Sequence, residues 1–124
     1  MIRAALLALV VAGAARADWT PPTATDVALL AADEALILVD MGQTIGACRD
    51  PFAVMCEGGL GILVLGQKPS TEAIVRASVG TMIGTAALWL VLPDGWRKTL
   101  TLTIGVGEGL NVTHNALVGA AIRF

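Results

Sequence analysis

The sequence predicts an all-α fold, a small helical membrane bundle of about three helices that follows a signal peptide. Of the 124 residues, 56% are hydrophobic, against roughly 45–50% in an average soluble domain, and the mean hydropathy is +0.76. The second observation is that residues 1–17 have the composition of a signal peptide, and the third is that residues 77–92 are apolar and uncharged. A chain of this length has room for one domain, which we place at residues 18–124.

The N-terminal segment has the three parts of a secretory signal. Arg3 lies in a short basic region, residues 4–15 form an apolar core, and Ala15-Arg16-Ala17 is a small-x-small cleavage pattern. The alternative is an uncleaved signal anchor, although the apolar run is shorter than the ~20 residues that a spanning helix needs. We expect cleavage after Ala17 and a location in the bacterial inner membrane with an exported N-terminus.

The charge balance limits the partners. The chain has 8 Lys and Arg against 10 Asp and Glu, a net charge of -2, and no basic run that would neutralise phosphates along a strand. Nucleic-acid binding is therefore not expected. The predicted partners are the lipid bilayer and other membrane proteins or a second copy of the chain.

The mature chain opens with an extended leader and a first helix. Pro21-Pro22 excludes helix, Thr25 is a suitable N-cap, and the helix is expected to start near Asp26 and to cover residues 27–45.

Three polar residues of this first helix share one face. Asp33, Asp40 and Thr44 recur at i, i+7 and i+11. Because a carboxylate is costly against lipid, this face turns toward protein or the helix lies in the membrane interface. The remaining alternative is an amphipathic helix on a water-soluble domain.

Residues 46–69 form a loop that holds the two cysteines. Cys48 and Cys56 close a disulfide if the loop faces an oxidising compartment, and they are free thiols if it faces the cytoplasm. With a single His in the chain, no metal site is predicted.

The second helix is the clearest membrane span. Ser70 or Thr71 caps its start, Glu72 favours the positive end of the helix dipole, and the uncharged residues 77–92 complete about the 20 residues that a crossing needs. Pro93 and Gly95 then make a turn, and Trp96 beside two cations has the pattern of an interfacial anchor.

The C-terminal stretch, residues 99–124, reads either as helix or as strand. Six apolar residues all fall on even positions, namely Leu100, Leu102, Ile104, Val106, Leu110 and Val112. Together with the terminal Phe124, this alternation also fits the closing strand of a small outer-membrane β protein. A barrel needs at least about eight strands, and residues 27–45 and 77–92 do not alternate. We therefore predict helix.

Polar residues of this last helix gather on one side. Glu108, Asn111 and Asn115 lie at i, i+3 and i+7, with His114 beside them. Facing the first helix, they form a polar intramembrane cluster whose predicted members are Asp40, Gln43, Thr44, Glu108, Asn111, His114 and Asn115.

Two functions fit such a cluster. In the first, the side chains hydrogen-bond the helices together in a structural or accessory membrane protein with no enzymatic activity. In the second, Glu108, Asp40 and His114 exchange protons in a membrane enzyme or proton-coupled module. No nucleophile motif or cofactor fingerprint occurs in the sequence, so no cofactor and no catalytic residue is predicted.

Several short motifs together resemble a loose group of small, uncharacterised integral-membrane proteins of proteobacteria and their phages. In order, they are Asp40-x-x-Gln43-Thr44, Leu65-Gly66-x-x-Pro69-Ser70, Leu92-Pro93-x-x-x-Arg97, Glu108, and His114-Asn115. A Glu-x-Asn-Pro element of the group is absent here. The resemblance implies a helical membrane fold of about three spans and implies no activity.

Overall fold

The structure is a computed structural model that describes residues 19–50, 56, 65–120, 122 and 124. These residues form three helices, α2 (Ala24–Cys48), α4 (Thr71–Val91) and α5 (Asp94–Leu117), with no strand among them. The predicted all-α bundle of three helices is thus confirmed. The predicted signal peptide, residues 1–17, lies outside the described residues.

α2 starts two residues before the predicted position because Thr23, and not Thr25, is its N-cap. Thr23 N and Oγ1 donate to Asp26 Oδ2 at 2.8 and 2.7 Å, and Asp26 N donates to Thr23 Oγ1 at 3.2 Å. This reciprocal capping satisfies backbone donors that the first helical turn leaves free. The hydrogen bonds from Thr23 also hold the pKa of Asp26 below its usual range.

α4 begins and ends where the sequence predicts. Ser70 Oγ accepts from Ala73 N at 3.1 Å, and the helix stops at Val91 because Leu92 and Pro93 adopt extended backbone angles. Its 21 residues span about 31 Å at 1.5 Å per residue, close to the ~30 Å of a hydrocarbon core. In the described part of the chain, α4 is the one helix long and apolar enough to cross a membrane.

α5 is helical despite its alternating pattern, so the strand alternative for residues 99–117 is wrong. Its threonines donate to backbone carbonyls four residues earlier, as Thr99 Oγ1 does to Gly95 O at 2.9 Å and Thr113 Oγ1 to Gly109 O at 2.7 Å. These bonds satisfy the hydroxyl groups inside the helix.

The last helix ends earlier than predicted. It stops at Leu117, and Gly119 takes a positive φ of 83°, a conformation that glycine adopts without steric cost. Ala120 N donates back to Asn115 O at 2.9 Å, and the side chains of Ile122 and Phe124 lie against Gly42 of α2.

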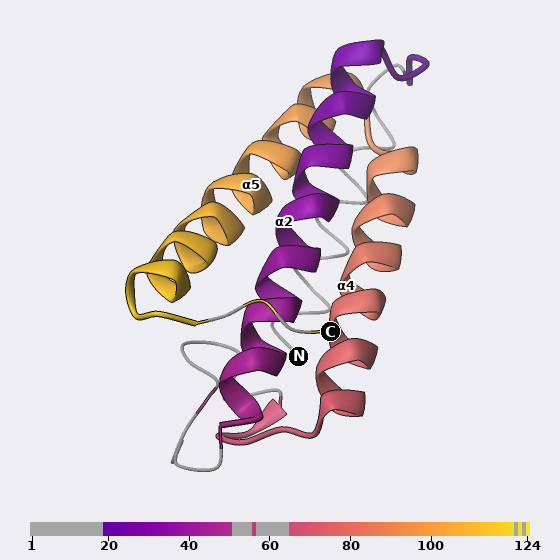
Figure 1. Cartoon of the computed structure of the whole chain (residues 1–124). Coiled ribbons are helices and arrows are strands. Elements are labelled where there is room, and N and C mark those ends of the chain that lie inside the picture. The colour runs from indigo at the N-terminus through magenta and orange to yellow at the C-terminus, as the bar shows by residue number, and fades with distance from the viewer. Residues whose placement is uncertain (1–18, 51–55, 57–64, 121, 123) are drawn as a thin grey trace.

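α2 lies between α4 and α5, and both of these helices pack against it (Figure 1). α5 runs in the same direction as α2, and α4 runs in the opposite direction. A small apolar core of Met41, Ile45 and Ile74, with Cys48 packed against it, joins α2 to α4.

Candidate functional site

Two side-chain hydrogen bonds join α2 to α5. Asn115 Nδ2 donates to Asp40 Oδ1 at 2.9 Å, and Gln43 Nε2 donates to Val112 O at 3.3 Å. Hydrogen bonds of this kind hold helices together where water does not compete for the polar groups. We call this contact line between α2 and α5 the polar seam.

Seven residues before Asp40, about two turns nearer the start of α2, the seam includes Asp33. This side chain is 4% exposed, and its Oδ2 has no hydrogen-bond partner. The backbone of α5 comes so close that a Cβ placed on Gly105 would lie 2.7 Å from Asp33 Oδ1. The absence of a side chain at residue 105 therefore leaves the space that the Asp33 carboxylate occupies against α5.

Glu108 completes an acidic group in the seam. It is half-buried on α5, and the negative charges of Asp40 and Asp33 both act on its carboxyl. The described residues hold no group of three or more His, Cys, Asp or Glu side chains that fits a metal ion. The arrangement brings together carboxylates and amides suited to hydrogen bonding.

The predicted cluster divides into members of the seam and exposed residues. Gln43 and Thr44 are buried, while Asp40, Glu108 and Asn115 are half-buried. Asn111 and His114 are exposed on α5, and the structure does not bring them to the contacts that Asn115 makes. Asp33, which the sequence placed on the same face as Asp40, belongs to the seam.

A second buried polar site was not predicted. Arg97, in the first turns of α5, is 0% exposed. Its guanidinium lies 5.2 Å from the centre of the Trp19 ring and 5.6 Å from that of Trp89. Its Nε donates to Trp89 O at 3.2 Å, whereas Nη1 and Nη2 are buried without a partner. We call Arg97 with these two tryptophans the arginine cage.

The contacts within the arginine cage do not fully offset the free-energy cost of burying the charge of Arg97. A buried, unpaired charge costs several kcal/mol, and each cation–π contact returns roughly 2 kcal/mol when desolvated. The carboxylate of Asp26 is 1% exposed and responds to the charges of Arg97 and Lys98, but among the described residues no ion pair joins it to Arg97. The terminal nitrogens of Arg97 therefore keep unused donors.

The one signal for this site in the sequence is that Arg97 directly follows Trp96, one of only three tryptophans in the chain. The sequence does not indicate that Trp19 and Trp89 lie together. The fold brings them together, and Trp19 Nε1 donates to Leu90 O at 3.0 Å. The sequence interpretation assigned Arg97 to an interfacial anchor instead.

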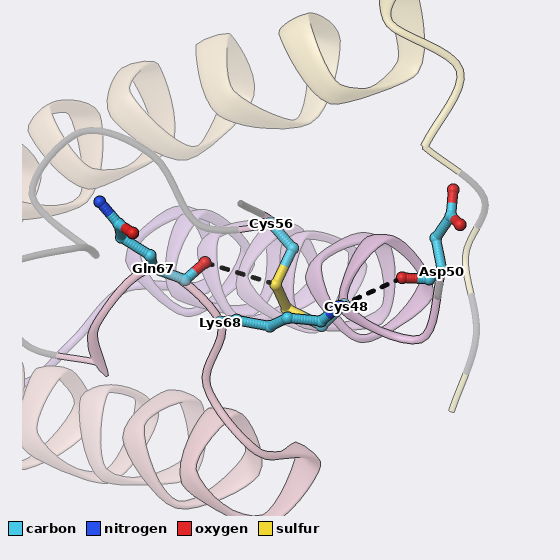
Figure 2. The surroundings of a disulfide bond; sticks show 5 residues. All are labelled: Cys48, Asp50, Cys56, Gln67 and Lys68. Carbon is cyan, nitrogen blue, oxygen red and sulfur yellow. Dashed lines mark hydrogen bonds between the residues drawn. A yellow bond between two sulfur atoms is a disulfide. The ribbon is translucent and has the colours of Figure 1, made fainter. Parts of the chain in front are cut away.

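At the opposite end of the bundle, a disulfide joins Cys48 to Cys56, with Cα atoms 4.9 Å apart (Figure 2). Cys56 N donates to Gln67 O at 2.9 Å, and Lys68 Nζ donates to Asp50 O at 3.4 Å. These contacts tie the end of α2 to the segment that leads into α4.

Comparisons of the chain with protein-family models, with curated proteins and with solved structures give no match.

Proposed function

We propose that this protein is a small integral-membrane protein of the bacterial inner membrane with a structural or accessory role. The polar seam holds its helices together, and its apolar outer faces contact lipid and a partner protein. The observation that carries the proposal is that, among the described residues, many apolar side chains are exposed and many polar side chains are buried, the reverse of a water-soluble domain.

That inversion is visible residue by residue. Apolar side chains are exposed on α4 and α5, among them Val75, Val79, Ile83, Leu90, Leu102, Val106 and Leu110. Polar and charged side chains are buried, among them Asp33, Gln43, Thr44, Thr85, Arg97 and Thr101. A water-soluble domain seldom exposes contiguous apolar faces of this kind, whereas in lipid the polar groups must find partners inside the protein.

The exposed apolar side chains form stripes. On α4 Val75, Val79 and Ile83 lie at i, i+4 and i+8, and on α5 Leu102, Val106 and Leu110 have the same spacing. Residues four apart lie on one face of a helix. Each stripe therefore presents a continuous surface to lipid acyl chains.

The disulfide supports one orientation. Disulfides persist in oxidising compartments such as the periplasm, so we place Cys48 and Cys56 on that side and do not retain a cytoplasmic position for them. A crossing α2 then puts Trp19 at the inner surface. A signal that exports the chain, whether cleaved after Ala17 or kept as an anchor, instead puts Trp19 at the periplasmic surface and favours an α2 that lies on that surface. Accessibility of the start of α2 to a protease added from the periplasmic side distinguishes the two.

Membrane fractionation followed by extraction with alkaline carbonate tests the location. We expect the protein to stay with the membrane pellet, because its apolar stripes are held by lipid and not by charge. Quantitative release into the carbonate supernatant would contradict an integral position.

A matched pair of carboxylate variants tests the role of the seam. Glu108→Gln removes a half-buried charge of the seam, and Glu72→Gln removes an exposed one whose side chain is 71% accessible and paired with Arg76. Of the two variants, we expect only Glu108→Gln to change the abundance of the protein in the membrane.

Purification of the wild-type protein from membranes tests the accessory role. We expect a membrane partner to be recovered with it, and purification as a lone monomer would count against that role.

A proton-coupled module is the second candidate, and the acidic group favours it. Asp33, Asp40 and Glu108 share the seam, and Asp33 Oδ2 has no partner. Polar residues at such positions often serve ion or proton pathways. This candidate predicts that Glu108→Gln leaves abundance unchanged and abolishes a pH-dependent activity, whereas His114→Ala, at an exposed position, has a small effect.

A further inference from the structure

The arginine cage lies where the leader, the end of α4 and the start of α5 meet. We propose that Arg97 is the binding site for a phosphate group, the phosphodiester of a lipid headgroup, which reaches the guanidinium when Trp19 moves away. The proposal rests on the membrane location proposed above, because that location brings lipid phosphates to this end of the bundle.

The unpaired donors of Arg97 define the chemistry of the ligand. Nη1 and Nη2 form the outer edge of a planar guanidinium, and both are buried without an acceptor. That edge matches the paired oxygens of a phosphate or carboxylate, which accept two parallel hydrogen bonds. Nε is already used by Trp89 O at 3.2 Å, so the backbone at the end of α4 holds the guanidinium in place.

The two faces of the guanidinium are covered unequally. Trp89 is 3% exposed and belongs to α4, whereas Trp19 is 54% exposed and belongs to the extended leader. Trp19 is held by one side-chain hydrogen bond, from Nε1 to Leu90 O. Trp89 is thus a fixed wall and Trp19 a removable cover.

The charges around Arg97 balance one another, so the binding of an anion depends on the edge of the Arg97 guanidinium. Lys98 Nζ pairs with Asp94 Oδ2 at 3.0 Å, and Asp26 Oδ2 accepts from Thr23. Arg97, Lys98, Asp26 and Asp94 carry two charges of each sign, so no general positive field attracts an anion. Recognition therefore depends on the geometry of the Arg97 fork.

The height of the arginine cage along the bundle agrees with the phosphate layer. The apolar helix α4 ends at Val91, and Trp96, which is 47% exposed, follows just after it. Tryptophan side chains concentrate where the hydrocarbon core meets the headgroups. Arg97 lies at that level, next to Trp96.

Calorimetric titration of the protein in maltoside, a detergent without phosphate, tests the proposal. The probes are dihexanoylphosphatidylglycerol, dihexanoylglycerol with the same tails and no phosphate, and inorganic phosphate. We expect saturable binding of the phospholipid and none of dihexanoylglycerol. Arg97→Lys should weaken binding at least tenfold, because an ammonium does not form the paired bonds, and Arg76→Lys, at an exposed arginine, should leave it unchanged.

Trp19→Ala keeps the proposal falsifiable if Arg97 variants fold poorly, because it removes the cover and keeps the guanidinium. We expect it to tighten phospholipid binding about tenfold, since the open form no longer has to be populated against the Trp19 contacts. In Trp96→Phe, the fluorescence of the two remaining tryptophans, Trp19 and Trp89, should also change as the phospholipid saturates.

The outcomes distinguish a lipid phosphate from a soluble phosphate, and they distinguish failure of the Arg97 site from failure of the proposed membrane location. Equal binding of inorganic phosphate supports the Arg97 site with a soluble phosphate as its ligand, even if carbonate releases the protein from membranes. Binding of the phospholipid that Arg97→Lys leaves intact, binding of dihexanoylglycerol at the same affinity, or weaker binding in Trp19→Ala would each overturn the proposal.

Discussion

Gly105 provides the sharpest test of the polar seam, since adding one methyl group at this residue places a carbon 2.7 Å from Asp33 Oδ1. A carbon and an oxygen that are not bonded do not approach so closely, so Asp33 or α5 must move. Asp33 is 4% exposed and has little room for that movement. Gly105→Ala therefore adds strain at the contact of the two helices.

The expected magnitude is a difference between two effects. Alanine is favoured over glycine inside a helix by up to about 1 kcal/mol, and overpacking of a tight contact costs roughly 1–3 kcal/mol. Gly105→Ala should therefore lower the free energy of unfolding by up to about 2 kcal/mol, once the gain in helix preference is subtracted from the larger cost.

Gly107 is the matched control, because nothing lies within 4 Å of a Cβ at that residue. Gly107→Ala gains the helix preference without the contact and should stabilise the protein by up to about 1 kcal/mol. In an Asp33→Ala background, Gly105→Ala should also become stabilising, because the opposing carboxylate is gone.

Thermal unfolding in a mild detergent, followed by circular dichroism, measures the series. A change of 1 kcal/mol corresponds to roughly 4–8 °C in the midpoint for a domain of this size. A stabilisation by Gly105→Ala that equals that of Gly107→Ala would refute the close approach of α5 to Asp33.

Four further predictions concern the disulfide, the two residues that cap α2, and the seam. Replacing both Cys48 and Cys56 by serine should cost about 2–3 kcal/mol from the lost chain constraint, and an unchanged denaturant midpoint would contradict it. Thr23→Ala should cost about 1 kcal/mol. Because the pKa of Asp26 is lowered in the folded state, its contribution is complete above about pH 4 and is lost as the pH falls further. In Asp26→Asn, the midpoint measured over this acid range should lack that component. Asn115→Ala leaves the Asp40 carboxylate without the hydrogen bond and should cost roughly 1.5–3 kcal/mol, measured by denaturant unfolding.

Much of the helical framework was predictable because it depends on local chemistry. Ser70 and Pro93 mark the ends of α4, and the spacing of Asp33, Asp40 and Thr44 identified the inner face of α2. The start of α2 was misplaced because two threonines compete for the cap, and only Thr23 has Asp26 three residues later. The end of α5 was missed because glycines occur at residues 105, 107, 109 and 119, and only the structure shows that Gly119 is the one among them with a positive φ.

The composition of the seam was only partly predictable, for a geometric reason. At 3.6 residues per turn, Asn115 lies about 20° from Glu108 around the helix, whereas Asn111 lies about 60° and His114 about 120° away. The contact with α2 is narrow, so it takes in Glu108 and Asn115 and leaves Asn111 and His114 exposed.

The arginine cage was beyond sequence reasoning because it depends on tertiary contact. The hydrogen bond from Trp19 to Leu90 joins residues 71 positions apart, and no spacing rule connects them. Burial of Arg97 also contradicts the usual exposure of arginine. Only the arrangement of the leader beside the end of α4 brings the two tryptophans onto one cation.

The central place of α2 has a consequence for how the protein is made. A chain leaves the ribosome from its N-terminus, so α2 is complete before either helix that packs against it. α4 then meets a finished partner, to which Cys48 and Cys56 fasten the intervening segment at one end, and α5 docks last along the other side of α2 (Figure 1). When α4 or α5 leaves the ribosome, the surface of α2 on which it packs has already been synthesised.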